Sequence, residues 1–219
     1  MKAYERLLKY AVIKTPSDET STSTPSSECQ FDLANLLKKE MEELGVSDIQ
    51  LTDNCFLYGK LPATKGYENA PAIGFIAHMD TVADYCEQPI RPIIIKNYNG
   101  KELALGNSGL TLSPKMFPHL ESLKGYTLIT TDGNTILGAD DKAGIAEIMT
   151  LVEHFRKNPF LMVLFPLPLL LMRKLARELL ILMWSYLAQI LPIHWTVLQR
   201  ENWSMKTLMH AVLLLIFMG

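Results

Sequence analysis

The chain has 219 residues, 48% of them hydrophobic, and a formal net charge of −2. This length can bury a substantial core in one large domain or two small ones. The near-neutral charge argues for neither a nucleic acid nor an acidic surface as partner, so we expect no nucleic-acid partner. Three cysteines without metal-binding spacing argue against a disulfide framework, and the N-terminus has no signal-peptide pattern, so we expect a cytoplasmic protein.

The pattern predicts a first long helix over residues 30–45, which Gly45 ends. Short apolar runs at 72–78 and 126–130 predict buried strands, and residues 142–157 predict a second helix that ends in basic residues. Strands that alternate with helices predict an α/β fold, with a mostly parallel sheet flanked by helices. The expected buried face of the first helix is Leu33, Leu36, Leu37, Met41 and Leu44, and that of the second is Ile145, Ile148, Met149, Val152 and Phe155.

Two acidic clusters follow the predicted strands and suggest half of a metal site. His78 and Asp80 stand at the end of the first strand, where α/β proteins place ligands. Asp140 and Asp141 stand just before the second helix, and carboxylates at such a junction suit zinc or a hard ion. Taken alone, His78 would be read as structural and Asp140 as a helix N-cap, but capping and ligation are compatible roles.

The composition changes near Pro159. Residues 160–219 contain two acids, and no glycine precedes Gly219, whereas an α/β segment of this length should carry turn signals. Their leucine-rich runs are shorter than the roughly 20 apolar residues of a membrane-spanning helix, so we expect no membrane association. The sequence therefore predicts two parts, an α/β part over 1–159 and an aberrant leucine-rich tail over 160–219.

Seven stretches of the first part occur together: 14–19 (KTPSDE), 24–26 (TPS), 73–81 (IGFIAHMDT), 112–114 (LSP), 116–118 (MFP), 127–133 (TLITTDG) and 137–149 (LGADDKAGIAEIM). In this order and spacing they resemble the peptidase T family, the tripeptide aminopeptidases among the dinuclear-zinc aminoacylase and carboxypeptidase-like metallopeptidases. The resemblance implies an incomplete zinc-peptidase catalytic domain, and a fold without the family's lid and dimerisation domain.

The resemblance also implies residue roles and a cofactor of two zinc ions per site. His78 is similar to the ligand of one zinc, and Asp140 to the carboxylate that bridges both. Asp80 is similar to the catalytic-site acid that orients the histidine ligand. Asp141 stands where the family often has a cis peptide after the bridging acid. The general base should come next, from a Glu-Glu pair, but this sequence has Arg173 and Lys174 there, so no general base is present.

The genetic code suggests why the tail departs from the family. If residues 172–178 are written ATG AGG AAG TTG GCA AGG GAx, reading from one base earlier gives GAT GAG GAA GTT GGC AAG GGA, or DEEVGKG, with the missing Glu-Glu pair. The single-codon residues Met172, Met183, Trp184 and Trp195 all fit this reading. We therefore predict that residues from about Phe160 are an out-of-frame translation.

The expected function is that of a zinc-dependent aminopeptidase that releases the N-terminal residue from tripeptides. Because the general base and several ligands are missing, we expect this chain to be inactive, and without the lid domain we expect no family-type homodimer. Two alternatives stay open. One is a remnant module that binds metal or protein without catalysis, and the other is a membrane-associated peptidase-like protein.

Overall fold

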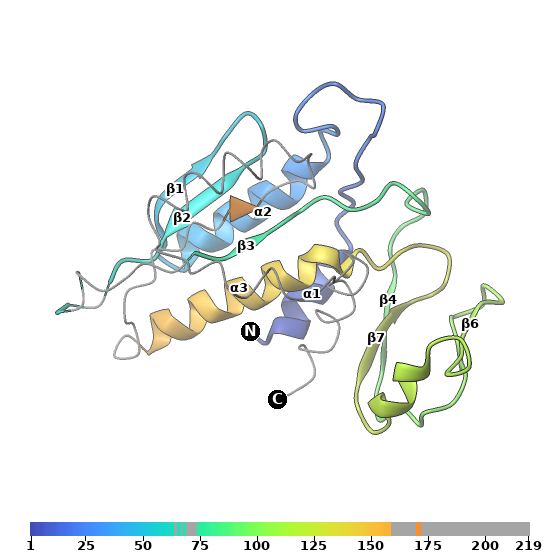
Figure 1. Cartoon of the computed structure of the whole chain (residues 1–219). Coiled ribbons are helices and arrows are strands. Elements are labelled where there is room, and N and C mark those ends of the chain that lie inside the picture. The colour runs from blue at the N-terminus through green and yellow to red at the C-terminus, as the bar shows by residue number, and fades with distance from the viewer. Residues whose placement is uncertain (64, 67, 69–73, 159–169, 172–219) are drawn as a thin grey trace, which may run out of the picture.

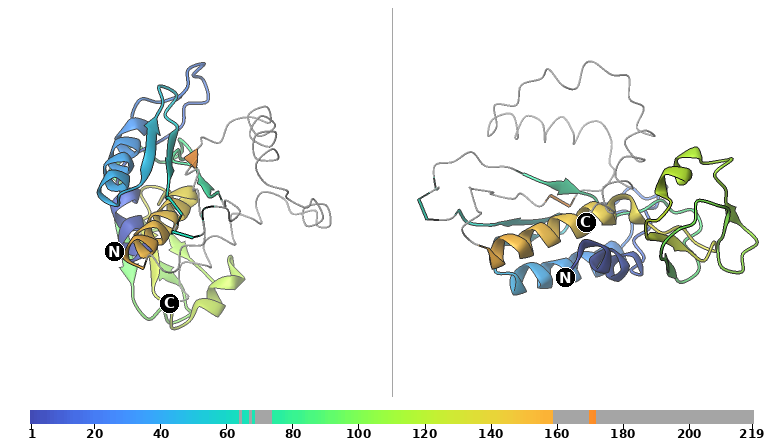
Figure 2. Two further views of the ribbon diagram at one scale, coloured as in Figure 1. Left: turned by 90° about the vertical axis from the view of Figure 1, so that its left-hand side faces the viewer. Right: turned by 90° about the horizontal axis from the view of Figure 1, so that it is seen from below.

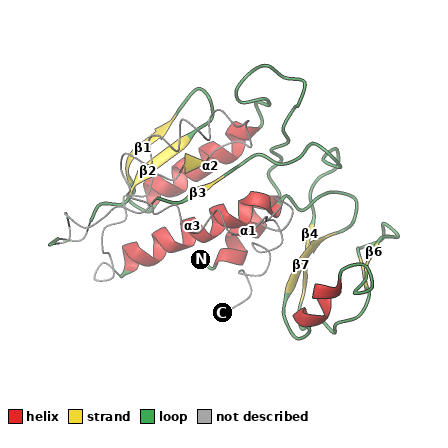
Figure 3. Ribbon diagram, viewed as in Figure 1, coloured by secondary structure: helices red, strands yellow, loops and turns green. Residues whose placement is uncertain are grey.

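The computed structural model describes residues 1–63, 65–66, 68, 74–158 and 170–171 (Figure 1). Helices and short strands mix along the chain, so the predicted α/β class is confirmed (Figure 3). The elements are α1 (Ala3–Ala11), α2 (Gln30–Glu43), β1 (Ser47–Leu51), β2 (Leu57–Lys60), β3 (Ile76–Ala77), β4 (Pro92–Ile95), β5 (Leu103–Ala104), β6 (Thr111–Leu112), the 3₁₀ helix η1 (Pro118–Leu123), β7 (Leu128–Thr131), α3 (Ala139–Lys157) and β8 (Leu170–Leu171).

The two predicted helices are confirmed as α2 and α3, and α1 packs against α3. Helix α2 ends just before Gly45, whose φ of +69° is a left-handed conformation that glycine adopts at little cost. A Cβ on this residue would also lie 2.6 Å from Nη2 of Arg156. Glycine is therefore required here both for its backbone angle and for the close approach of α3.

The described strands pair mainly in antiparallel fashion, so the mostly parallel sheet expected from the sequence is not confirmed. Strands β1 with β2, β4 with β7, and β5 with β6 are antiparallel, and β3 with β8 is parallel. For β1 with β2, and for β5 with β6, the physical reason is connection length, since each pair is joined by a short segment and a parallel pair needs a crossover of a dozen or more residues.

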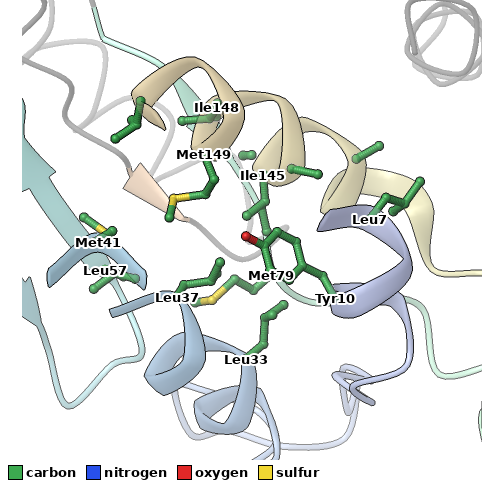
Figure 4. Close-up of a cluster of buried hydrophobic side chains, with 14 of the residues drawn as sticks. Leu7, Tyr10, Leu33, Leu37, Met41, Leu57, Met79, Ile145, Ile148 and Met149 are labelled. Atoms are coloured by element: carbon green, nitrogen blue, oxygen red, sulfur yellow. The ribbon is translucent and has the colours of Figure 1, made fainter. Parts of the chain in front are cut away.

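The main core lies among the three helices and the strands β1–β3. Figure 4 shows Tyr10 of α1, Leu37 of α2 and Ile145 of α3 pointing towards one another, with Met79 between them. All of the apolar positions predicted for α3 are buried here, whereas Leu36 and Leu44 of α2 are only partly buried at its edge. The seen-from-below view in Figure 2 shows α1, α2 and α3 side by side, with the blue-green strands on one face of them and the green segment that carries β4 to β6 beyond one end.

A small lobe formed by residues 92–131 lies to one side of the helices (Figure 1). It contains β4 to β7 and η1, and its own buried cluster consists of Tyr98, Leu120 and Leu128. Strand β7 belongs to both parts, because Leu128 packs in the lobe while the next residue, Ile129, packs in the main core. Successive side chains of a strand point to opposite faces, so β7 joins the two cores.

The main region also buries a charged cluster between its helices. Arg6 and Glu40, each less than a tenth exposed, form an ion pair, and the Tyr10 hydroxyl donates a hydrogen bond of 2.6 Å to Glu40. Arg6 also pairs with Glu153 of α3 at 2.8 Å, and Lys9 pairs with Glu40. The cluster thus ties α1 to both α2 and α3.

Among the described residues, the helices are all too short or too polar to cross a membrane. Apart from β8, the tail predicted to be aberrant lies outside the described residues, and so do Arg173 and Lys174.

Candidate metal centre

His78 and Asp80 lie in the turn that follows strand β3. The Nδ1 atom of His78 lies 2.9 Å from the backbone oxygen of Asp80 and 3.4 Å from its Oδ1. Asp80 is 4% exposed, and His78 is more exposed, with 24% of its side chain accessible. A neutral imidazole whose Nδ1–H donates to a backbone oxygen keeps its Nε2 available for another partner.

Asp140 reaches the same place from the opposite direction, through the loop between β7 and α3. Its Oδ1 lies 3.1 Å from Nε2 of His78, although the two residues are 62 positions apart. Gly138 makes this approach possible, because its φ is +66° and a Cβ there would lie 3.1 Å from the Thr81 side chain. The structure therefore brings together the predicted residues His78, Asp80 and Asp140.

Asp141 has a different role from its neighbour. Its Oδ1 accepts a hydrogen bond of 3.2 Å from the backbone N–H of Gly144, three residues on, which is the pattern of a helix N-cap. The backbone angles of Asp140 and Asp141 are not helical, so the regular turns of α3 start after them. The capping role considered for Asp140 thus falls to Asp141. The peptide bond between them is cis, as the resemblance implied.

The charges at the site are strongly coupled. Burial disfavours the charged form of His78, but hydrogen bonds to Asp140 and Asp80 outweigh burial and raise its pKa to about 10. Burial raises the pKa of Asp141 to about 6, although the positive charge of His78 and the Gly144 N–H oppose this. The protonated His78 ring therefore donates from Nε2 to the Asp140 carboxylate and from Nδ1 to the Asp80 backbone oxygen, with the Asp80 carboxylate beside it.

Two residues that the sequence analysis did not assign hold the turn of His78 and Asp80 in place. Ser17 donates a hydrogen bond of 2.6 Å from its hydroxyl to Oδ2 of Asp80. The Thr15 hydroxyl donates to the backbone oxygen of Met79 at 2.7 Å. Both lie in the KTPSDE stretch that carries the resemblance, but nothing in their spacing points to the turn of His78 and Asp80, because the contacts span 63 and 64 positions.

Lys142 was also missed. Its side chain is fully buried in the first turn of α3, and its ammonium donates to the backbone oxygen of Ile13. Burial lowers its pKa to about 8. Sequence pattern alone does not distinguish a buried lysine at this position from a solvent-exposed one.

The donors present match two positions of a zinc site. Two ligands about 2.0 Å from a tetrahedral ion lie about 3.3 Å apart, close to the 3.1 Å between His78 Nε2 and Asp140 Oδ1. A structural or catalytic zinc ion usually has about four ligands. In the part of the chain that the structure describes, no group of three or more histidine, cysteine or carboxylate side chains surrounds a common point. His78 and Asp140 therefore fit as part of a zinc site, and the described residues do not complete it.

Comparison with known proteins gives relatives for much of the chain. No family model matches. Peptidase T of Clostridium perfringens is 47% identical over 158 residues, and the match covers 72% of this chain and 38% of that protein. Peptidase T of Aliivibrio fischeri is 49% identical over 155 residues, which cover 71% of this chain and 38% of the relative.

Two solved structures show a more distant likeness. A tripeptidase from Staphylococcus aureus subsp. aureus Mu50 is 20% identical with a TM-score of 0.47, and the match covers 78% of this chain and 35% of that one. An aminoacylhistidine dipeptidase from Vibrio alginolyticus is 19% identical with a TM-score of 0.45, over 80% of this chain and 28% of that one.

The resemblance inferred from the motifs is confirmed at the level of sequence. The chain spans about 38% of the length of the curated relatives it matches. Over a partial, N-terminal segment, the chain is related to peptidase T.

Proposed function

We propose that residues 1–159 form the N-terminal part of the catalytic domain of a zinc-dependent aminopeptidase acting on tripeptides. The observation that carries the proposal is the convergence of His78 Nε2 and Asp140 Oδ1 to 3.1 Å from two separate turns. The similarity to peptidase T over the N-terminal segment supports it.

In this proposal His78 would hold one zinc ion, and Asp140 would hold that ion and a second one. When bound, zinc would polarise the scissile carbonyl and lower the pKa of a water molecule. The residues of this chain prepare the place for it. The backbone oxygen of Asp80 accepts a hydrogen bond from Nδ1 of His78, with the Asp80 carboxylate beside it, so that Nε2 faces Asp140, and Asp141 fixes the start of the helix behind Asp140.

We further propose that the 219-residue chain does not hydrolyse peptides by itself. Arg173 and Lys174 stand in the sequence where the resemblance expects the general base and a zinc ligand, and neither can accept a proton from water or bind zinc as a carboxylate does. The division at 159, with an out-of-frame tail after it, accounts for this change. Sequencing the gene across the Pro159 codon tests it, and DNA that cannot encode DEEVGKG one base out of register contradicts it.

A second candidate function is a remnant module that binds metal without catalysis. The two donors His78 and Asp140 favour this second candidate, because two ligands can still hold a zinc ion, although more weakly than the usual four. Both candidates place the protein in the cytoplasm without a nucleic-acid partner. Both candidates share the relationship to peptidase T, and they differ in whether the site takes part in catalysis or only binds metal. Zinc binding and peptide cleavage therefore have to be measured separately.

The experiment is a calorimetric zinc titration of the full chain and of its His78→Ala and Asp140→Asn variants, with His154→Ala as the matched control. His154 is exposed at the far end of α3. We expect weak binding that falls at least about tenfold in the two site variants and not in the control. Unchanged affinity in His78→Ala would refute the metal site. Tripeptide hydrolysis that His78→Ala abolishes would instead show an active enzyme and overturn the proposed inactivity.

A further inference from the structure

We propose that Ser17 is a positioning residue for the candidate ligands His78 and Asp140, because it holds Asp80, whose backbone oxygen and carboxylate both face Nδ1 of His78. The benefit of this positioning rests on the proposed zinc site, but the contacts of Ser17 are present without zinc. The positioning begins with residues 13–17, which we call the brace segment.

The brace segment runs alongside the turn that carries His78. The backbone N–H of Ser17 donates to the Thr81 oxygen at 2.8 Å, and the Thr81 N–H donates to the Thr15 oxygen at 2.9 Å. Together these bonds form a parallel bridge between Pro16 and Thr81. The Thr15 side chain is fully buried and adds its bond to Met79. The backbone on both sides of Asp80 is therefore fixed relative to Ser17.

The hydroxyl of Ser17 then acts on the Asp80 carboxylate itself. Ser17 Oγ lies 2.6 Å from Oδ2, while Oδ1 of the same carboxylate lies 3.4 Å from His78 Nδ1, next to the Asp80 backbone oxygen that lies 2.9 Å from Nδ1. Asp80 is 4% exposed, and a buried carboxylate needs hydrogen-bond donors in place of water. With Oδ2 held by Ser17, rotation of the carboxylate is restrained, and Oδ1 stays on the side of the imidazole.

The brace segment also reaches the second ligand-bearing element. Lys142, two residues after Asp140, donates to the Ile13 oxygen from a fully buried position. One short stretch near the N-terminus thus contacts both the turn of His78 and the first turn of α3, which are 62 positions apart in sequence. The spacing between the two zinc donors depends on contacts that neither donor makes itself.

The test uses the full chain, first without zinc. The test variant is Ser17→Ala, the rescue variant is Ser17→Thr, and the control is Ser23→Ala. Ser23 lies in the same loop, is exposed, and bonds with Ser21 and the Pro25 oxygen. The readout is the exchange with water of the His78 Nδ1–H proton, followed by NMR of ¹⁵N-histidine-labelled protein and assigned with His78→Ala. Far-UV circular dichroism confirms that each variant folds.

We expect Ser17→Ala to speed this exchange about tenfold, the size of effect that loss of one charge-assisted hydrogen bond produces, and Ser17→Thr to restore it. Ser23→Ala should leave it unchanged. Exchange unaltered in folded Ser17→Ala, or altered equally in Ser23→Ala, overturns the proposal.

A zinc titration of the same variants separates this inference from the proposed function. We expect Ser17→Ala to weaken zinc binding by about three- to tenfold, less than loss of a ligand's direct partner. If no zinc binds to the unmodified chain while the His78 proton responds to Ser17→Ala and recovers in Ser17→Thr, the metal site fails and the positioning role of Ser17 stands. If zinc binds and that proton does not respond, the metal site stands and the role of Ser17 is refuted.

Discussion

The main region and the small lobe bury apolar residues on very different scales. The main core draws on three helices and several strands, whereas the lobe of residues 92–131 encloses Tyr98, Leu120 and Leu128. All of the proposed site residues and the whole charged cluster belong to the main region or to the loop entering α3. The lobe contributes strand β7, which leads into that loop. The main region is therefore expected to set the stability of the site, and the lobe to set only the path of the chain into it.

The largest effect is expected from a cavity in the main core. Leu37 of α2 is fully buried among side chains of the three helices (Figure 4), so Leu37→Ala should lower the free energy of unfolding by about 2–5 kcal/mol. Urea denaturation followed by circular dichroism at helical wavelengths measures it. A smaller loss than that of Leu120→Ala in the lobe would show that the main core is not the more stabilising of the two regions.

The buried charged cluster should come next. Glu40→Gln keeps the side-chain volume but leaves Arg6 and Lys9 without the carboxylate that they share. Because the buried Arg6 then loses one of its two carboxylate partners and retains Glu153, we expect a loss of about 2–3 kcal/mol in the same denaturation experiment. Glu43→Gln, at an exposed position of the same helix, is the matched control and should change stability little. Equal losses would show that the ion pairs contribute nothing specific.

The same cluster gives the main region a defined acid sensitivity. Hydrogen bonds from Lys157, the N-terminal ammonium and Arg6 lower the pKa of Glu153 to about 2 from an ordinary value of 4.5. Burial of Glu40 opposes its ionisation, but hydrogen bonds from Lys9 and Tyr10 lower its pKa too. Because the folded pKa values are depressed, the stabilisation is complete above about pH 4.5 and is lost as the pH falls towards 2.

Denaturation midpoints measured from pH 6 to pH 2 test this dependence. Glu153→Gln should flatten the decline, because the substituted side chain takes up no proton in this range. A curve of the same steepness in the variant would contradict the assignment to Glu153.

The smallest effect is expected in the lobe. Leu120 is 7% exposed in a cluster of few residues, so Leu120→Ala should cost about 1–2 kcal/mol, because such a site can collapse around the missing atoms. Hydrogen exchange should show faster opening of amides in 92–131 and unchanged protection in α3. Equal acceleration in α3 would mean that the two cores unfold as one unit through β7.

Sequence pattern predicted some parts of this fold well and others poorly, for identifiable reasons. Helices α2 and α3 were predictable because their apolar residues recur with helical period, and Gly45 marks the end of α2. The pairing of the strands was not, because a two-residue strand such as β3 carries no sign of its partner. Capping was assigned to the wrong one of two adjacent aspartates, since only the backbone angles show where the regular helix starts.

By itself, the sequence determined the α/β class, the two long helices, the relationship to peptidase T, and the pairing of His78 with Asp140 as candidate ligands. These follow from periodicity and from short motifs, which are local properties of a chain. The tertiary structure alone decided that Ser17, Thr15 and Lys142 brace the candidate site, and that Asp141 caps α3. The physical reason is that a buried carboxylate or ammonium takes whichever partner packing brings within hydrogen-bond distance, and for the brace residues that partner lies dozens of residues away in the chain.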